Sequence, residues 1–465
     1  MNSLVEKFLD IEEKYDLWNH NIGEFQIWNR TRLELFRMIE RFVCGSDIVT
    51  VSYRQQFTRE GKIYTEEEKR IYVDELVDFY KNTEILIINS KHRMLISEGG
   101  YICPITGMIS QLCDAKIKYC IQSYRKTENE EYIDLSVIDY DRVPLNESQL
   151  VDIELVNGYV NDISNIFEMN LSVNFDDIFY DDFREHILYV VGMMGYKGFY
   201  QKLLSAISPK AVVVASGYAI INSIILEAAN ELGIKTIEMQ HGQIGTEHIA
   251  YNSKRDRSFD LAIPRYMLVY GQFDIDTIRN YVCKNRMIAT GNLFLDRYVK
   301  KYKNNKGEKK MQTTVLVVSY IAQNTKLVDF AIEIKQKHCD WDVIYRFHPE
   351  ETIYDDVVSV LQKEKIIVDM DFNTSVYDDV SKSDYIIGSH STVLCEALCF
   401  NKKTFRIDVD NGGEIRESEK HIRTISNVED FEAKRDEDFS VTSLSNYFYA
   451  PNKDKMSRFF NEICR

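Results

Sequence analysis

The stretch that decides the fold is AVVVASGYAIINSIILEAANELGIKTIEMQHG, residues 211–242. It opens with a continuous apolar run (211–216), continues as an amphipathic helical pattern that stops at Gly233, and closes with a second apolar run (234–239). Continuous apolar strands separated by a helix are typical of a parallel sheet covered on both faces. The stretch therefore predicts a strand–helix–strand unit whose last strand ends in a histidine.

The same alternation extends toward the C-terminus. Further strand-like runs follow at 265–271, 286–292, 313–320, 342–349, 365–370, 384–389 and 403–409, with helical patterns at 326–337 and 392–400. A polar segment with six lysines, VKKYKNNKGEKKM (299–311), interrupts them. We expect two Rossmann-like α/β domains, 1–300 and 313–465, facing a cleft and joined by a basic linker at 301–312. This linker is either a solvated hinge or a segment that attracts phosphates or lipid headgroups.

The first domain carries additions. The periodicity of apolar residues predicts helices in 1–45 and across 146–207. Strand-like runs occur at 47–53 and 84–90, and a Gly-Gly turn within 94–107 predicts a hairpin. A C-terminal helix is expected at 455–464.

Composition narrows the class of protein. The chain has 465 residues, 45% of them hydrophobic, and a formal net charge of −16. This charge argues against nucleic-acid partners. An odd count of 9 cysteines fits a reduced compartment, and the charged N-terminal stretch does not resemble a signal peptide. We expect a cytoplasmic protein and leave open a peripheral position at the inner face of the cell membrane.

Four expected strand ends carry unusual residues, and ligands of open parallel sheets bind beyond the carboxyl ends of the strands. After the first strand of the opening stretch come Ser216 and Gly217, which suit either an ordinary turn or a close approach of the backbone to a ligand. After its second strand come Gln240, His241 and Gly242. A histidine there either supports the structure or acts as a base or phosphate ligand.

The other two strand ends lie in the second domain. Arg346 and His348 precede Pro349, which fixes the direction of the chain after the imidazole. In GSHSTVLCEAL (388–398), Ser389, Ser391 and Thr392 stand at an expected helix start, where hydroxyls and backbone N–H groups suit an anion. Glu396 follows Thr392 by one helical turn and suits the two hydroxyls of a ribose. Capping of the helix explains one of these hydroxyls but not all three.

Residues 205–410 resemble GT-B glycosyltransferases of bacterial surface-polysaccharide synthesis. The resemblance rests on EMQHGQIG (238–245), YGQFDIDTI (270–278), IATGNLFLD (288–296), YRFHPE (345–350) and SDYIIGSHSTVLCEALCFNKKTFRID (383–408). A His-Pro strand end followed by a Ser/Thr helix start is similar to bacterial sialyl- and polysialyltransferases. The Gln-His-Gly element is also similar to capsule Kdo transferases and to glycerophosphotransferases.

The resemblance implies roles for particular residues. His348 and Ser391 or Thr392 would contact the phosphate of the nucleotide donor, and Glu396 would hold its ribose. It implies no tightly bound catalytic metal and no cofactor beyond the nucleotide-sugar substrate. The paired acid of the sialyltransferase base element is missing, because SEGG (97–100) offers only Glu98. His241 is therefore the first candidate for the general base, followed by Glu238 and Glu98.

The sequence thus favours transfer of a sugar from a nucleotide-activated donor, a CMP-sugar first, to a surface-polysaccharide or lipid-linked acceptor. His241 and His348 would be the catalytic residues. Three alternatives stay open: a UDP-sugar 2-epimerase, a glycerophosphotransferase, and a non-catalytic scaffold that binds sugar nucleotides.

Overall fold

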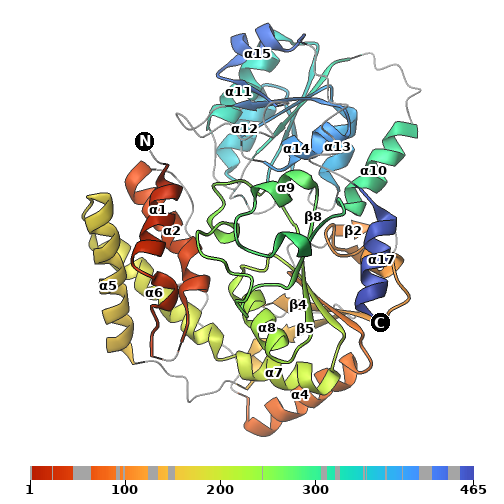
Figure 1. Cartoon of the computed structure of the whole chain (residues 1–465). Coiled ribbons are helices and arrows are strands. Elements are labelled where there is room, and N and C mark those ends of the chain that lie inside the picture. Colours follow the sequence, from red (N-terminus) through yellow and green to blue (C-terminus); the bar gives the residue numbers. More distant parts are fainter. Residues whose placement is uncertain are drawn as a thin grey trace.

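Two parallel sheets organise the chain (Figure 1). The computed structural model describes residues 3–23, 25–45, 64–90, 95–97, 100–123, 135–144, 152–242, 244–304, 312–319, 325–348, 351, 353–371, 374–389, 391–407, 422–437 and 451–465. The strand expected at 47–53 lies outside these residues.

The first sheet has seven strands in the order β5-β4-β1-β6-β7-β8-β9, and all neighbours are parallel. Its strands are β1 (Ile85–Ser90), β4 (Ile117–Ser123), β5 (Leu135–Asp139), β6 (Ala211–Ala215), β7 (Lys235–Met239), β8 (Tyr266–Val269) and β9 (Met287–Ala289). The chain winds outward from β1 in one direction and from β6 in the other. The order therefore reverses between β1 and β6.

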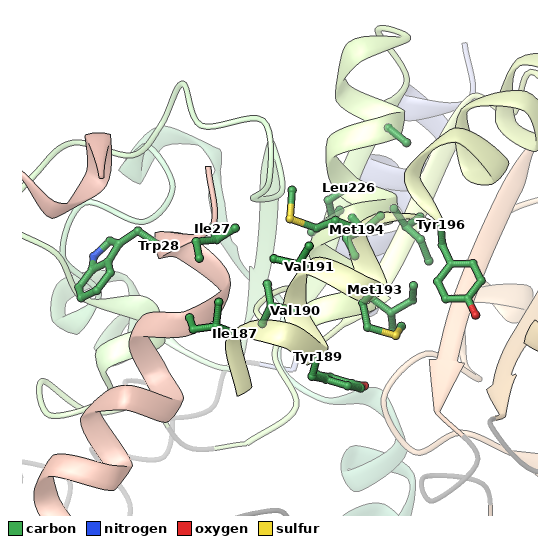
Figure 2. Close-up of a cluster of buried hydrophobic side chains, with 14 of the residues drawn as sticks. Ile27, Trp28, Ile187, Tyr189, Val190, Val191, Met193, Met194, Tyr196 and Leu226 are labelled. Atoms are coloured by element: carbon green, nitrogen blue, oxygen red, sulfur yellow. The ribbon is translucent and has the colours of Figure 1, made fainter. Parts of the chain in front are cut away.

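Both faces of the first sheet are covered, as the apolar strands predict. Leu86, Ile88, Val212 and Val214 point into a helical layer, while alternate residues such as Val213 point to the opposite face. The helices are α1 (Leu4–Lys14), α2 (Trp28–Cys44), α4 (Glu66–Tyr80), α5 (Ile153–Leu171), α6 (Asp177–Met194), α7 (Lys197–Ile207) and α8 (Ile220–Glu231). Side chains of α6 fill the space between α2 and α8 (Figure 2).

The second sheet has six parallel strands in the order β12-β11-β10-β13-β14-β15. They are β10 (Thr314–Val318), β11 (Asp342–Arg346), β12 (Ile367–Asp369), β13 (Tyr385–Gly388), β14 (Lys403–Ile407) and β15 (Arg423–Ile425). One face packs against α11 (Thr325–Lys337), α12 (Asp355–Lys363) and α15 (Val428–Lys434), the other against α13 (Val376–Lys382) and α14 (Val393–Cys399). Here the strand order reverses between β10 and β13.

The expected fold class, two Rossmann-like α/β domains with helical and hairpin additions to the first, is confirmed. The hairpin pairs β2 (Leu95–Ser97) with β3 (Gly100–Ile102) in antiparallel register. The sequence patterns did not predict β4, β5 or β15, whose polar and charged residues interrupt the apolar runs.

Two segments lie elsewhere than the expected domain boundaries place them. The basic segment begins as helix, because α10 (Leu293–Asn304) runs to Asn304 and packs on α13 of the second domain. The C-terminal helix α17 (Lys453–Ile463), expected with the second domain, buries Met456, Phe459 and Phe460 against the first sheet. Figure 1 shows the C-terminus beside the first domain. The apolar face of α17 matches the face of the first sheet that the N-terminal helices leave uncovered.

Within the described ranges, no helix is both long and apolar enough to span a bilayer.

Candidate functional site

The carboxyl ends of the two sheets meet. Gly242 follows β7 and Thr392 follows β13, and a Cβ on Gly242 would lie 3.5 Å from Thr392 Cγ2. The helix α10 joins the domains beside this contact, where Phe294 and Val299 pack against Tyr377 of α13. The two expected ligand-binding edges therefore face each other across one junction.

His241 lies on the first-domain side of this junction. Its Nε2 is hydrogen-bonded to the Tyr218 hydroxyl at 3.2 Å, and the two ring centroids are 5.6 Å apart. Its Nδ1 is closed off from solvent. Both His241 and Tyr218 are partly exposed. The accessible ring nitrogen of His241 is therefore Nε2, which meets Tyr218.

A buried carboxylate supports the rings around His241. Glu238 is fully buried, and it accepts hydrogen bonds from Tyr251 Oη to Oε1 at 2.5 Å and from Tyr281 Oη to Oε2 at 2.8 Å. Tyr251 in turn packs edge-on against Tyr218, with centroids 5.4 Å apart, and against His248 at 4.9 Å. Burial, and next the charge of Glu238, raise the pKa of both buried tyrosines well above the usual value. Glu238, a candidate base from sequence, therefore lies behind the ring layer and holds it.

Ser216 and Gly217 make the turn from β6 to α8. Ser216 adopts a left-handed backbone conformation with φ of 65°, and Asn222 Nδ2 donates to the carbonyls of Ala215 and Ser216. A Cβ on Gly217 would lie 2.5 Å from Glu238 Oε2 and 2.9 Å from Tyr281 Oη. Glycine is needed here to accommodate the buried carboxylate, an interaction that the sequence alone did not indicate.

Gln240 clamps two loops together. Its Oε1 accepts from Tyr270 N at 2.6 Å, and its Nε2 donates to Gly242 O and to Asp274 Oδ1, each at 2.8 Å. Burial raises the pKa of Asp274 to about 7, and hydrogen bonds from Gln240 and the Gly271 N–H oppose this rise. The contacts favour a positioning role for Gln240, whose expected contact with the donor stays a prediction.

On the second-domain side, Ser389 stands directly after β13. It is 2% exposed, and its Oγ has no hydrogen-bond partner among the described residues. Ser391 Oγ accepts at 3.3 Å from the N–H of Val393, the first residue of the short helix α14, while Thr392 is partly exposed toward Gly242. A buried hydroxyl without a protein partner costs free energy unless a ligand or water satisfies it.

His348 follows two residues after the end of β11 and is held by a tight turn. Its backbone N–H donates to Glu351 Oε2 at 3.1 Å, and the Glu351 N–H donates to His348 O at 3.0 Å. The Glu351 carboxylate is also hydrogen-bonded to Ser319, directly after β10. The backbone at His348, whose side chain is partly exposed, is thus tied to the end of the neighbouring strand through Glu351, which the sequence patterns did not single out.

Arg346 is engaged inside the second domain. Its guanidinium pairs with Asp369 and Asp379, and it donates to the carbonyls of Asp371 and Thr374. Asp379 is partly buried, and burial raises its pKa to about 6. These contacts tie β11 to β12 and α13, and binding of the donor by Arg346 stays a prediction.

Glu396 lies on α14 beside Tyr377. Burial raises its pKa to about 7, and a hydrogen bond to Tyr377 opposes the rise. Tyr377 belongs to the apolar cluster that joins α10 to the second domain. Glu396 thus lies near the connection between the domains, and its role toward a ribose stays a prediction.

The structure brings Gly242, directly after Gln240 and His241 in the chain, next to Thr392, and it places Ser389 and His348 at the carboxyl edge of the second sheet. Glu98 lies outside the described residues. The described part of the chain holds no group of three or more His, Cys, Asp or Glu side chains placed to bind a metal ion.

Comparisons with known proteins give distant likenesses only. No protein-family model matches the chain, and no curated protein does. The structure is similar to the wall teichoic acid polymerase TagF, with 10% identity, a TM-score of 0.47, and 94% of this chain and 97% of that chain covered. It is also similar to UDP-GlcNAc 2-epimerase from Neisseria meningitidis, with 11% identity, a TM-score of 0.47, and 82% and 98% covered. Likenesses this low say nothing of what the chain binds.

Proposed function

We propose that this protein is an enzyme that transfers a sugar from a nucleotide-activated donor to a hydroxyl of a glycan or lipid-linked acceptor. The observation that carries the proposal is the meeting of two reversal-point edges, with His241 on one side and, on the other, the Ser389 hydroxyl, which has no hydrogen-bond partner in the described parts of the chain. Ligands of open α/β sheets bind at such edges. Two facing sites suit a reaction between two substrates.

The two sides divide the chemistry. In the second domain we assign Ser389, Thr392 and His348 the role of stabilising the negative charge that develops on the leaving phosphate. In the first domain we assign His241 the role of taking the proton of the acceptor hydroxyl. A CMP-sugar is the donor to test first, because the motifs around His348 and Ser391 are similar to those of sialyltransferases.

Release of nucleotide tests this function. Purified wild-type protein is incubated with CMP-, UDP- and GDP-sugars and with CDP-glycerol, using water as the acceptor. We expect one donor to be turned over, and we expect His241→Ala and His348→Ala to lower kcat by about 100-fold or more. His20→Ala, a change in the N-terminal helical region, serves as the control and should keep wild-type kcat.

The results of this assay distinguish between the candidate functions. Turnover of CDP-glycerol alone supports glycerophosphate transfer, and epimerisation of a UDP-sugar without nucleotide release supports an epimerase. Unchanged turnover in both histidine variants contradicts the assigned site. Binding of a nucleotide-sugar without turnover supports the scaffold.

A further inference from the structure

Tyr218 lies beside His241 at the carboxyl edge of the first sheet. It follows the strained turn at the carboxyl end of β6, the strand at which the order of the first sheet reverses. Its hydroxyl lies 3.2 Å from His241 Nε2, and it is partly exposed. Because His241 Nδ1 is closed off from solvent, a proton that reaches this ring from a substrate arrives through the Nε2 side.

Several aromatic rings and a buried carboxylate hold the Tyr218 ring in place. Rings of His241, His248 and Tyr251 surround it at centroid distances of 5.6, 5.5 and 5.4 Å. Tyr251 is fixed by the buried Glu238, whose other oxygen is held by Tyr281. Arg257 lies over the Tyr281 ring at 5.3 Å. Burying a carboxylate is costly, so support of this kind under a partly exposed tyrosine points to a function beyond folding.

We propose that Tyr218 is a further catalytic residue, which relays the proton of the acceptor hydroxyl to His241; this rests on the function proposed above. In the neutral imidazole with its proton on Nδ1, the Tyr218 hydroxyl donates to Nε2. The acceptor O–H bond breaks as its oxygen bonds to the sugar carbon of the donor. The acceptor proton moves to Tyr218 Oη, the Tyr218 proton moves to His241 Nε2, and the donor C–O bond breaks with its electron pair on the phosphate.

Tyr218→Phe tests the relay, because it keeps the ring contacts and removes only the hydroxyl. With the donor that the wild-type protein turns over and water as the acceptor, we expect kcat to fall about 100-fold or more, with the donor KM unchanged. Tyr354→Phe, at an exposed tyrosine of the second domain, is the matched control and should keep wild-type kcat. A kcat for Tyr218→Phe within about threefold of wild type overturns the relay.

A proton inventory in mixtures of H₂O and D₂O separates a relay from a positioning role. Two protons moving in one step bow the plot of rate against deuterium fraction, and one proton gives a straight line. We expect a bowed plot for the wild-type protein, while a straight line overturns the relay.

The hydrogen bond itself is measured without any donor. In protein labelled with ¹⁵N-histidine, Tyr218→Phe should move the Nε2 resonance of His241, and Tyr354→Phe should leave it in place. An unmoved resonance in Tyr218→Phe overturns the relay at its first step. If the wild-type protein turns over no donor, the transferase function fails and the relay fails with it; if only Tyr218→Phe behaves as wild type, the relay alone fails.

Discussion

Gly217 shows how a single residue ties the fold to the site. The position lacks a side chain because the Glu238 carboxylate and the Tyr281 hydroxyl occupy the space where a Cβ would lie. The same carboxylate orients Tyr251 and, through it, the rings around His241. The need for glycine at position 217 looks like a property of the local turn, but it is set by Glu238, twenty-one positions further along the chain.

Gly217→Ala should destabilise the protein. Its Cβ would lie 2.5 Å from Glu238 Oε2, so a buried, doubly hydrogen-bonded side chain would have to move. We expect a loss of about 1–3 kcal/mol in the free energy of unfolding, as for other overpacked cores, measured by denaturant titration. Gly198→Ala is the matched control: it lies in α7 with nothing within 4 Å of its Cβ, and should stabilise by about 0.5–1 kcal/mol. Equal effects of the two changes would show that Gly217 is not crowded.

Prediction from sequence worked best for residues whose pattern is local. Ser389 and His348 were placed at strand ends because apolar runs stop directly before them. Spacing does not tell where a side chain points: polar groups of Gln240 and Arg346 contact other parts of the protein, and their expected binding of the donor stays a prediction. Tyr218 was missed because it belongs to no motif and only the folded chain brings it to His241. Glu351 stands three residues after His348, but no sequence pattern indicated that its carboxylate accepts from the His348 N–H.

At the scale of elements, a short polar clamp fixes the loops after β7 and β8. Gln240 Nε2 donates to Asp274 Oδ1, and Gly271 N donates to Asp274 Oδ2 at 3.1 Å. Asp274 is 3% exposed, and burial raises its pKa to about 7. The clamp therefore titrates near neutral pH while it holds the loop that carries His241.

Asp274 should make stability depend on pH. Its pKa is about 7 in the folded state and near 3.8 when unfolded, so between about pH 4 and pH 7 the folded state binds the proton more tightly. The contribution of Asp274 to the free energy of unfolding therefore falls as pH rises through this window, by a few kcal/mol at most. Melting temperatures of wild type and Asp274→Asn at pH 5 and pH 8 measure it.

The difference between the two proteins should favour wild type more at pH 5 than at pH 8. Asp276→Asn, at an exposed position of the same short helix α9 (Gln272–Thr277), is the control for removing a carboxylate from this helix. A difference for Asp274→Asn that is constant or grows toward pH 8 would contradict the raised pKa.

The strand–helix alternation was readable because buried parallel strands are continuous apolar runs. β6, β7, β10 and β13 have this pattern and were predicted. Strands β4 and β15 carry lysine, glutamine or arginine among few apolar residues, and their pairing comes from the sheet rather than from local pattern. Strands β4 and β5 lie beyond β1 and so create the reversal between β1 and β6, whereas β15 only extends the second sheet beyond β14.

At the scale of the whole molecule, the chain returns to its first domain. Lys210 and Lys235, next to β6 and in β7, donate from Nζ to the carbonyls of Cys464 and Ile463 at the end of α17. No local pattern could assign this helix to the first sheet, because its apolar face would fit either domain. The two domains are therefore joined twice, through α10 and through the segment that leads back to α17.

The central claim is that a nucleotide binds where the two sheet edges meet. The most direct measurement is the melting temperature of the full chain with CMP, CDP, UDP, GDP or dTDP, each with and without magnesium. We predict that one nucleotide raises the melting temperature, since a ligand that binds only the folded state stabilises it. The shift should shrink in Ser389→Ala, whose unliganded melting temperature should stay at or above that of wild type because Oγ makes no hydrogen bond to the described residues. If no nucleotide moves the melting temperature, or if Ser389→Ala responds as fully as wild type, the account of this junction as a nucleotide site is contradicted.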